Sequence, residues 1–329
     1  MEQRRRARHD IAPGSTGDRK WFPIGSHVRS DSHQKSPLPR LITFRKFLSS
    51  VALSLGLVTI ISSCAEYAPP HEHGEKIYRN VLFASPGGHP LRMDLYVPPT
   101  VEAAPVVIWI FGGSWRIGSK AYHVNVRDLT RHGMAVAAIQ YRLSGTATYP
   151  AQIEDCAEAL RWLQSHGSHY HIDPSRIGLS GESAGGHLAA LLGTMKGTPS
   201  VRAVFAMYPP TDLVTLGRKY ANPQQPSDID RLFGGPIEQK LKAAREVSPV
   251  NHVTSSSPPF LLMHGSLDEL VPLQQSEKLN NRLHDAGVES TLIVVPGKGH
   301  WFRLTEDQLK KVADFFRQHF RRQADRGPG

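Results

Sequence analysis

The chain has 329 residues, of which 40% are hydrophobic and 8% aromatic, and its formal net charge at pH 7 is +10. This composition is ordinary for a globular protein with a buried core, and it excludes collagen-like and low-complexity chains. Residues 1–63 hold eleven Lys and Arg against four acidic residues, so residues 64–329 hold 28 against 25 and carry a net charge of only +3. The basic excess therefore belongs to the N-terminal segment, which argues against a nucleic-acid partner.

Residues 41–64 read as an export signal. Two basic residues precede an apolar, uncharged run over 47–61, which is short for a membrane span but suits the apolar region of a secretory signal. The run closes with Ile61-Ser62-Ser63-Cys64, which resembles a bacterial lipobox. We expect cleavage before Cys64 and lipid attachment there, which would give a periplasmic or cell-envelope lipoprotein. An ordinary signal peptide, giving a secreted protein, and a single membrane anchor stay open, and residues 1–40 are a disordered leader or an over-long start.

Strand-like and helix-like segments alternate over residues 71–321, which predicts one α/β domain with a mostly parallel central sheet flanked by helices. Continuous apolar runs indicate buried strands, and apolar residues at helical spacing indicate the helices that cover them. The expected strands are 77–83, 91–97, 106–111, 134–141, 176–179, 203–208, 260–264 and 292–295, and the expected helices are 151–166, 186–194, 273–286 and 306–320.

The alternation breaks down in the insertion 209–258, which is rich in Pro, Gln and Ser and carries one expected helix around 239–245. An insertion between two strands of such a sheet often forms a cap over a site. A surface excursion without a function is the alternative interpretation.

Gly181-Glu182-Ser183-Ala184-Gly185 fits the pattern G-x-S-x-G, directly after an expected strand and before an expected helix. The two glycines let the chain turn tightly, which presents the Ser183 hydroxyl beyond the end of the strand. The backbone N–H of Ala184 points to the same place, at a helix N-terminus that favours negative charge. We therefore predict that Ser183 is a nucleophile and that Ala184 contributes to an oxyanion hole.

A serine becomes a nucleophile when a histidine removes its proton and a carboxylate orients that histidine. Asp268 follows the expected strand 260–264, and His300 follows the expected strand 292–295. Both therefore lie at carboxyl ends of strands, where the sites of open α/β sheets gather. The chain order Ser183, Asp268, His300 is the order of α/β-hydrolases. Glu269 stays open as an alternative acid.

Other polar residues have plainer interpretations. Glu182 is expected to face away from the hydroxyl, His187 and His264 to pack or form hydrogen bonds, and Asp155 and Asp212 to cap helices or loops. The histidines at 71, 73, 166, 169 and 171 lack a matching set of carboxylates or cysteines, so we expect no metal site.

The near-continuous run over 149–155, 159–163, 172–178 and 181–189 resembles bacterial esterases of the feruloyl-esterase-like and hormone-sensitive-lipase-like kind, which have the α/β-hydrolase fold. The likeness extends from about Ile77 to Phe320. It implies carboxylic-ester hydrolysis without a cofactor, with Ser183 as the nucleophile, His300 as the base and Asp268 as its partner.

The loop Phe111-Gly112-Gly113-Ser114-Trp115 resembles the His-Gly-Gly-x-Trp loop of that family, with Phe111 in place of the histidine. This resemblance implies that Gly113 and Ser114 join Ala184 as oxyanion donors, and the departure at Phe111 puts the geometry of the loop in question.

The expected activity is hydrolysis of small-molecule or polysaccharide-linked esters through an acyl-enzyme, in a pocket formed with Trp115, Trp301 and the insertion 209–258. Amidase, peptidase or arylformamidase action by the same triad stays open, because the related kynurenine formamidases carry the same Gly-Gly-x-Trp loop. A catalytically inert binding protein of this fold is the third hypothesis. Oligomeric state is left open.

Overall fold

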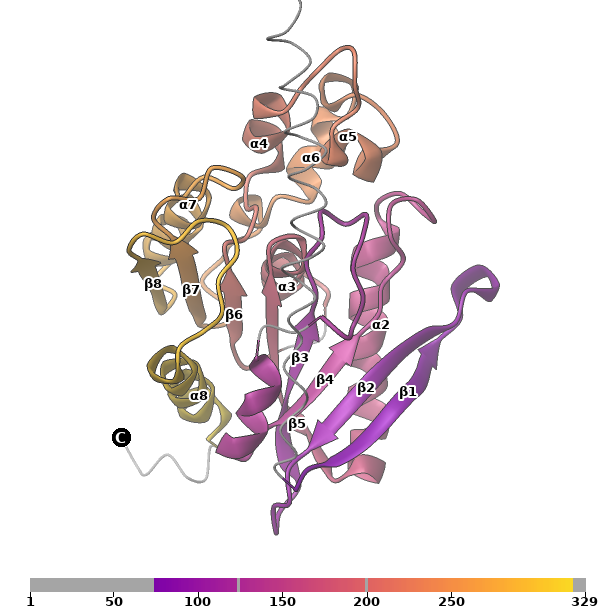
Figure 1. Cartoon of the computed structure of the whole chain (residues 1–329), viewed down its shortest axis with the longest axis vertical. Coiled ribbons are helices and arrows are strands. Elements are labelled where there is room, and N and C mark those ends of the chain that lie inside the picture. Colours follow the sequence, from indigo (N-terminus) through magenta and orange to yellow (C-terminus); the bar gives the residue numbers. More distant parts are fainter. Residues whose placement is uncertain (1–73, 123–124, 199–200, 322–329) are drawn as a thin grey trace, which may run out of the picture. The chain divides into compact units, whose positions relative to one another are not determined.

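Eight strands form one sheet in the order β1-β2-β4-β3-β5-β6-β7-β8 (Figure 1). The computed structural model describes residues 74–122, 125–198 and 201–321, so the predicted leader, the predicted signal and Cys64 lie outside the described residues. β1 pairs with β2 and β2 with β4 in antiparallel fashion, and all pairings from β4 to β8 are parallel, which confirms the predicted mostly parallel sheet. The strands are β1 Lys76–Ala84, β2 Leu91–Val97, β3 Ala104–Ile110, β4 Ala135–Ile139, β5 Ile172–Glu182, β6 Val204–Met207, β7 Phe260–Gly265 and β8 Ser290–Val295.

The sheet is covered on both faces, as its apolar strands require. In β3, Ile108 and its alternate neighbours pack into one apolar layer, whereas Val107 and Trp109 pack into the other. The helices α2 (Ala151–His166), α3 (Ala184–Thr194) and α7 (Gln274–Asp285) contribute to the first layer, and α8 (Glu306–Phe320) contributes to the second together with the 3₁₀ helix Val126–His132. A strand with helices on both faces has no solvent side, which explains the continuous apolar runs.

One sequence expectation about local structure needs correction. β5 is longer than the predicted strand 176–179, because it pairs with β3 as far as Gly181 and with β6 as far as Glu182. Asp155 caps a loop, as expected: it lies inside α2, its Oδ2 accepts from the backbone N–H of Arg142 at 2.8 Å, and its Oδ1 lies 2.7 Å from Arg142 Nη2. Asp212 does cap a helix, since its side chain accepts from the backbone N–H of Thr215.

The insertion 209–258, called the cap insertion below, forms α4 (Leu213–Lys219), α5 (Asp228–Phe233) and α6 (Leu241–Glu246) with two 3₁₀ turns. It follows β6, and Figure 1 shows its helices gathered beyond one end of the strands. Its apolar side chains, Leu216 and Ile229 among them, belong to the same buried layer as α2, α3 and α7. The cap insertion is therefore packed onto the sheet rather than looped out from it.

Within the described ranges, no helix combines the length and the apolar character that a bilayer crossing requires.

Candidate active site

Ser183 lies at a sharp turn between β5 and α3. Its backbone φ of 49° and ψ of −121° are rare for a residue with a side chain and mark a strained turn. A Cβ added at Gly185 would lie 2.0 Å from the carbonyl oxygen of Ile110, and one added at Gly181 would lie 2.4 Å from the carbonyl oxygen of Gly185. Only glycine fits at both positions, so the strand, the turn and the helix meet in the geometry that the G-x-S-x-G pattern requires.

The structure brings Ser183, His300 and Asp268 into one hydrogen-bonded chain. His300 Nε2 lies 2.8 Å from Ser183 Oγ, and His300 Nδ1 lies 2.7 Å from Asp268 Oδ2. Because the carboxylate can only accept, Nδ1 carries the proton, and Nε2 is left to accept from the serine hydroxyl. All three side chains are buried. This arrangement can deprotonate a serine as it attacks a carbonyl carbon.

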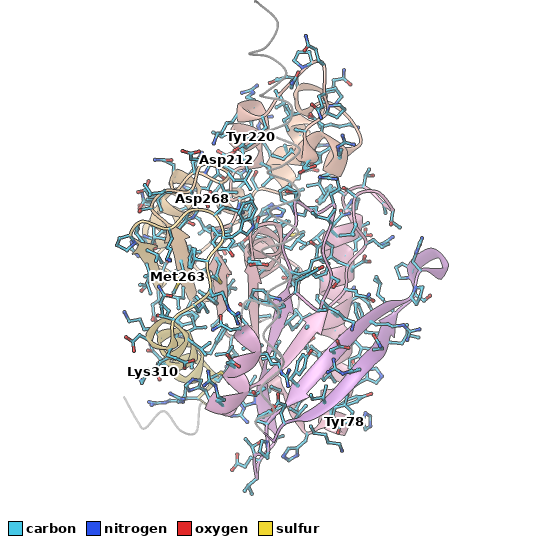
Figure 2. The ribbon with its side chains drawn as sticks, viewed as in Figure 1. Tyr78, Asp212, Tyr220, Met263, Asp268 and Lys310 are labelled. Carbon is cyan, nitrogen blue, oxygen red and sulfur yellow. The ribbon has the colours of Figure 1, made fainter. Side chains whose placement is uncertain are left out.

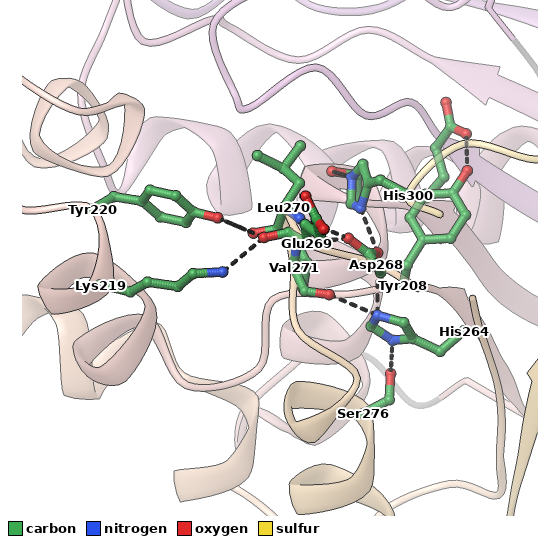
Figure 3. Close-up of polar contacts among 12 residues, drawn as sticks. Tyr208, Lys219, Tyr220, His264, Asp268, Glu269, Leu270, Val271, Ser276 and His300 are labelled. Carbon is green, nitrogen blue, oxygen red and sulfur yellow. Dashed lines mark hydrogen bonds and ion pairs between the residues drawn. The ribbon is translucent and has the colours of Figure 1, made fainter. Parts of the chain in front are cut away.

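Asp268 is held by donors on both of its oxygens (Figure 3). Oδ2 also accepts from His264 Nε2 at 3.2 Å, and Oδ1 accepts from the backbone N–H groups of Leu270 at 3.0 Å and Val271 at 2.8 Å. Burial by itself would raise the pKa of Asp268, but hydrogen bonds from His264 and His300 outweigh it and hold that pKa well below the ordinary value. The carboxyl group is therefore ionised at neutral pH.

Glu269, the alternative acid, is placed differently. Glu269 is exposed, whereas the Asp268 side chain hydrogen-bonds to His300. The structure thus brings one of the two candidate acids to the histidine.

His264 is a second histidine on the acid, and sequence reasoning missed this contact. It is fully buried, with Nε2 2.8 Å from the carbonyl oxygen of Val271 and Nδ1 2.7 Å from Ser276 Oγ. Since Nε2 faces two acceptors, it carries the proton, and Nδ1 accepts from the Ser276 hydroxyl. The predicted hydrogen-bonding role was sound, and the spacing of four residues between His264 and Asp268 was the available signal.

The Tyr208 ring packs against the rings of both His300 and His264. Its ring centroid lies 4.7 Å from that of His300, and its hydroxyl donates to Glu182 Oε2 at 2.7 Å. The backbone N–H of Gly112 also hydrogen-bonds to the Glu182 carboxyl group, whose pKa burial nevertheless raises. Glu182 therefore links the turn at Ser183 to the Gly-Gly loop, a role that the sequence pattern did not reveal.

The Gly-Gly loop is braced at both ends. The rings of Phe111 and Tyr141 stack with centroids 4.4 Å apart, and the Tyr141 hydroxyl donates to the Phe111 carbonyl at 3.1 Å. Trp115 Nε1 donates to His187 Nδ1 at 3.1 Å, so His187 Nε2 carries the proton that is donated to the carbonyl of Val247 in the cap insertion. Phe111 thus steadies the loop by stacking, although the related loops begin with histidine.

A cavity of about 330 Å³ opens beside Ser183. Ser114 and Ala184, two of the predicted oxyanion donors, line it, whereas Gly113 is not among the lining residues. Gly113 has a φ of +99°, and its carbonyl accepts from two backbone N–H groups of the same loop. That the backbone N–H groups of Gly113, Ser114 and Ala184 act as oxyanion donors stays a prediction.

Most of the remaining cavity wall comes from the cap insertion and the loop after Asp268. These residues are Pro210, Leu216, Tyr220, Asn222, Gln225, Pro226, Ser227, Asp228, Ile229, Leu270 and Val271. Trp115 also lines the cavity, as expected. Trp301 does not: it is 58% exposed and packs edge-on against His300.

No group of three or more His, Cys, Asp or Glu side chains suited to a metal ion occurs in the part of the chain that the structure describes.

Known proteins with related sequences and structures are named as esterases. Esterase LipC of Mycobacterium tuberculosis is 30% identical over 230 residues, which cover 65% of this chain and 56% of LipC. A truncated carbohydrate esterase from gut microbiota superposes with a TM-score of 0.68 at 29% identity, covering 76% of this chain and 98% of that one. Carboxyl esterase 2 from the mycorrhizal fungus Tuber melanosporum gives 0.64 at 27% identity, covering 78% and 90%.

The chain spans about half the length of the curated relatives it matches. A family model also matches: the BD-FAE model covers residues 93–283, which is more than half of the chain and includes Ser183, Asp268 and the whole cap insertion. With its eight-stranded sheet and the Ser–Asp–His order, the chain belongs to the BD-FAE family of α/β-hydrolases.

Proposed function

We propose that this protein is a serine carboxylesterase that forms an acyl-enzyme on Ser183. The observation that carries the proposal is the hydrogen-bonded chain from Ser183 Oγ through His300 to Asp268, which ends at a cavity of about 330 Å³. The esterase names of its relatives support the same reaction.

The reaction follows from the positions of the protons. Ser183 Oγ attacks the ester carbonyl carbon while His300 Nε2 takes the hydroxyl proton, and the negative charge that develops on the carbonyl oxygen is stabilised by backbone N–H groups of Ala184 and the Gly-Gly loop. His300 then donates its proton to the leaving alcohol. A water molecule attacks the acyl-enzyme with His300 as its base, which releases the acid and restores the serine.

For the substrate, we propose esters of hydroxyl-rich alcohols, including esters linked to polysaccharides. One structural relative is itself a carbohydrate esterase, which supports this class. So does the cap side of the cavity, where Asn222 and Gln225 supply amide groups that can hydrogen-bond to sugar hydroxyls.

The test is hydrolysis of p-nitrophenyl esters from acetate to decanoate, of a feruloyl ester and of an acetylated xylo-oligosaccharide, by the protein and by Ser183→Ala. We expect activity that depends on Ser183, with faster turnover of short acyl chains than of decanoate. Faster cleavage of a matched anilide would instead favour an amidase. The absence of both ester hydrolysis and fluorophosphonate labelling of Ser183 would identify an inert binding protein.

We also propose that the protein is exported and lipid-anchored at Cys64, on the basis of the charge and apolar pattern of residues 41–64. Growth of a bacterial expression host with radiolabelled palmitate tests this. Label in the wild-type protein that Cys64→Ser removes would support the anchor, and a labelled Cys64→Ser protein would contradict it.

A further inference from the structure

The cap insertion contacts the loop of the acid from the outside. Lys219 Nζ, at the end of α4, donates to the backbone carbonyl of Glu269 at 2.7 Å. The hydroxyl of Tyr220 lies 3.1 Å from the same carbonyl and 2.5 Å from the carbonyl of Leu270 (Figure 3). In Figure 2 Tyr220 and Asp268 both lie in the upper part of the molecule. Lys219 Nζ lies 4.9 Å from the centre of the Tyr220 ring, and its ammonium and the Tyr220 hydroxyl contact the same Glu269 carbonyl.

These carbonyls belong to the two peptide groups that hold the carboxylate. The peptide that contains the Glu269 carbonyl also contains the N–H of Leu270, and the next one contains the Leu270 carbonyl and the N–H of Val271. Both N–H groups donate to Asp268 Oδ1. In a trans peptide the C=O and N–H point in opposite directions, so each peptide has a cap donor at one end and the carboxylate at the other.

Hydrogen bonds in such chains polarise one another. An ammonium or hydroxyl on the carbonyl makes the N–H of the same peptide a stronger donor, and it also restrains the peptide plane. With Oδ1 held in this way, Oδ2 stays directed at His300 Nδ1, 2.7 Å away.

We infer that Lys219 and Tyr220 are positioning residues for Asp268, acting from the cap insertion through the peptides of residues 269–271. The inference rests on the proposed function, in which Asp268 orients His300. Its consequence is that the segment that forms much of the substrate pocket also sets the chemical step, so cap changes affect kcat as well as KM.

Tyr220 by itself cannot separate this role from substrate contact, because its side chain also lines the cavity. Lys219 can, since it is not among the lining residues. The neighbouring Arg218 offers a matched control: it leaves the same helix with the same charge, but its guanidinium pairs with Glu238 on the surface at 2.9 Å.

The experiment measures kcat and KM on p-nitrophenyl acetate for the full-length protein, for Lys219→Met, Tyr220→Phe and Arg218→Met, and for the conservative Lys219→Arg. One hydrogen bond lost from the chain predicts a fall in kcat of about threefold for Lys219→Met and about fivefold for Tyr220→Phe. KM should stay within about twofold, Arg218→Met should match the wild type, and Lys219→Arg should recover most of the loss.

The same two substitutions are then made in an Asp268→Asn background, whose residual activity is read against Ser183→Ala. A neutral amide gives the peptide N–H groups no charge to stabilise, so the effects of Lys219→Met and Tyr220→Phe should shrink to less than about 1.5-fold there. Undiminished effects in that background would overturn the inference, as would a rise in KM with unchanged kcat or equal results for Lys219→Met and Arg218→Met.

Failure of the proposed function gives a different result: a wild-type protein without Ser183-dependent ester hydrolysis would overturn both. An active wild-type protein, together with Lys219→Met and Tyr220→Phe variants of wild-type kcat, would overturn the positioning role and leave the proposed esterase function supported.

Discussion

The two walls of the pocket are built in different ways. The wall around Ser183 consists of strand ends, a tight turn and the first turn of α3, all buried, with the backbones of Gly185 and Ile110 in direct contact. The opposite wall consists of the short helices of the cap insertion. Their apolar side chains, Leu216 and Ile229 among them, are buried, and they also make exposed polar contacts such as Arg116 to Asp228, whose side chains are 40% and 36% exposed. The chemistry is thus placed by backbone packing that tolerates no added atom, whereas the substrate-facing wall combines buried apolar side chains with exposed polar contacts that each stabilise little.

This contrast is strongest for glycines, where we expect the largest effect. A methyl group at Gly185 would meet backbone oxygens of Ile110 and Phe111 that cannot move aside, so Gly185→Ala should destabilise the protein by more than about 4 kcal/mol and leave no measurable esterase activity. Gly235→Ala in the cap insertion is the matched control, because its new methyl group would meet only the flexible end of Lys240, 3.2 Å away. It should change the free energy of unfolding, measured in urea, by less than about 1 kcal/mol. Equal losses at both positions would remove the contrast.

The next largest effect is expected at His264, which donates a buried hydrogen bond to Asp268. His264→Phe removes a buried hydrogen bond to a charged group, and we expect kcat to fall about 30-fold with little change in KM. The control is His284→Phe, which removes an exposed histidine whose Nε2 lies 2.8 Å from the carbonyl oxygen of Ser290, away from Asp268. Steady-state kinetics on p-nitrophenyl acetate decides the matter, and a His264→Phe enzyme with wild-type kcat would show that His300 and the peptide N–H groups suffice.

His187 joins the two walls, because it hydrogen-bonds to Trp115 in the Gly-Gly loop and to the carbonyl of Val247 in the cap insertion. Burial lowers the pKa of His187 to about 4, against about 6.5 for an unfolded histidine. Because the folded pKa is the lower one, the unfolded chain takes up the proton first as the pH falls, so this contribution to stability is full above pH 6.5 and is lost between pH 6.5 and 4. By pH 5 the loss amounts to about 2 kcal/mol.

Urea unfolding at pH 7.5 and pH 5 measures this loss. Wild type should lose about 2 kcal/mol more than His187→Asn over that interval, since asparagine does not titrate. An identical pH dependence of the two proteins would mean that His187 is not held neutral at this junction.

The smallest effect on stability and kcat is expected from the exposed ion pair between Arg116 and the cap residue Asp228. Arg116 and Asp228 form a half-exposed ion pair between the Gly-Gly loop and the cap insertion, so Arg116→Met and Asp228→Asn should each change stability by less than about 1 kcal/mol and kcat by less than about twofold. Thermal unfolding and kinetics at 50 mM and 500 mM salt check this. A tenfold loss of activity at low salt would show that this single pair holds the cap in place.

Much of the site could be read from local patterns. The period of apolar residues and the turn residues determined most strands and the helices α2 and α8, and G-x-S-x-G between a strand and a helix pointed to Ser183. Asp268 and His300 could be named because each follows a strand, and parallel strands end at the same edge of the sheet. These inferences needed only neighbouring residues and the order of segments along the chain.

The contacts between distant segments were beyond such patterns. Ser183 and His300 are 117 residues apart, and only the strand order β5-β6-β7-β8 brings their loops side by side. The sequence by itself determined which residue types stand at the strand ends, because backbone period and turn geometry are local properties. The tertiary structure alone decided that Asp268 rather than Glu269 meets His300, that His264 and Tyr208 flank the pair, and that Lys219 and Tyr220 reach the acid loop, because those contacts depend on how independently formed segments pack.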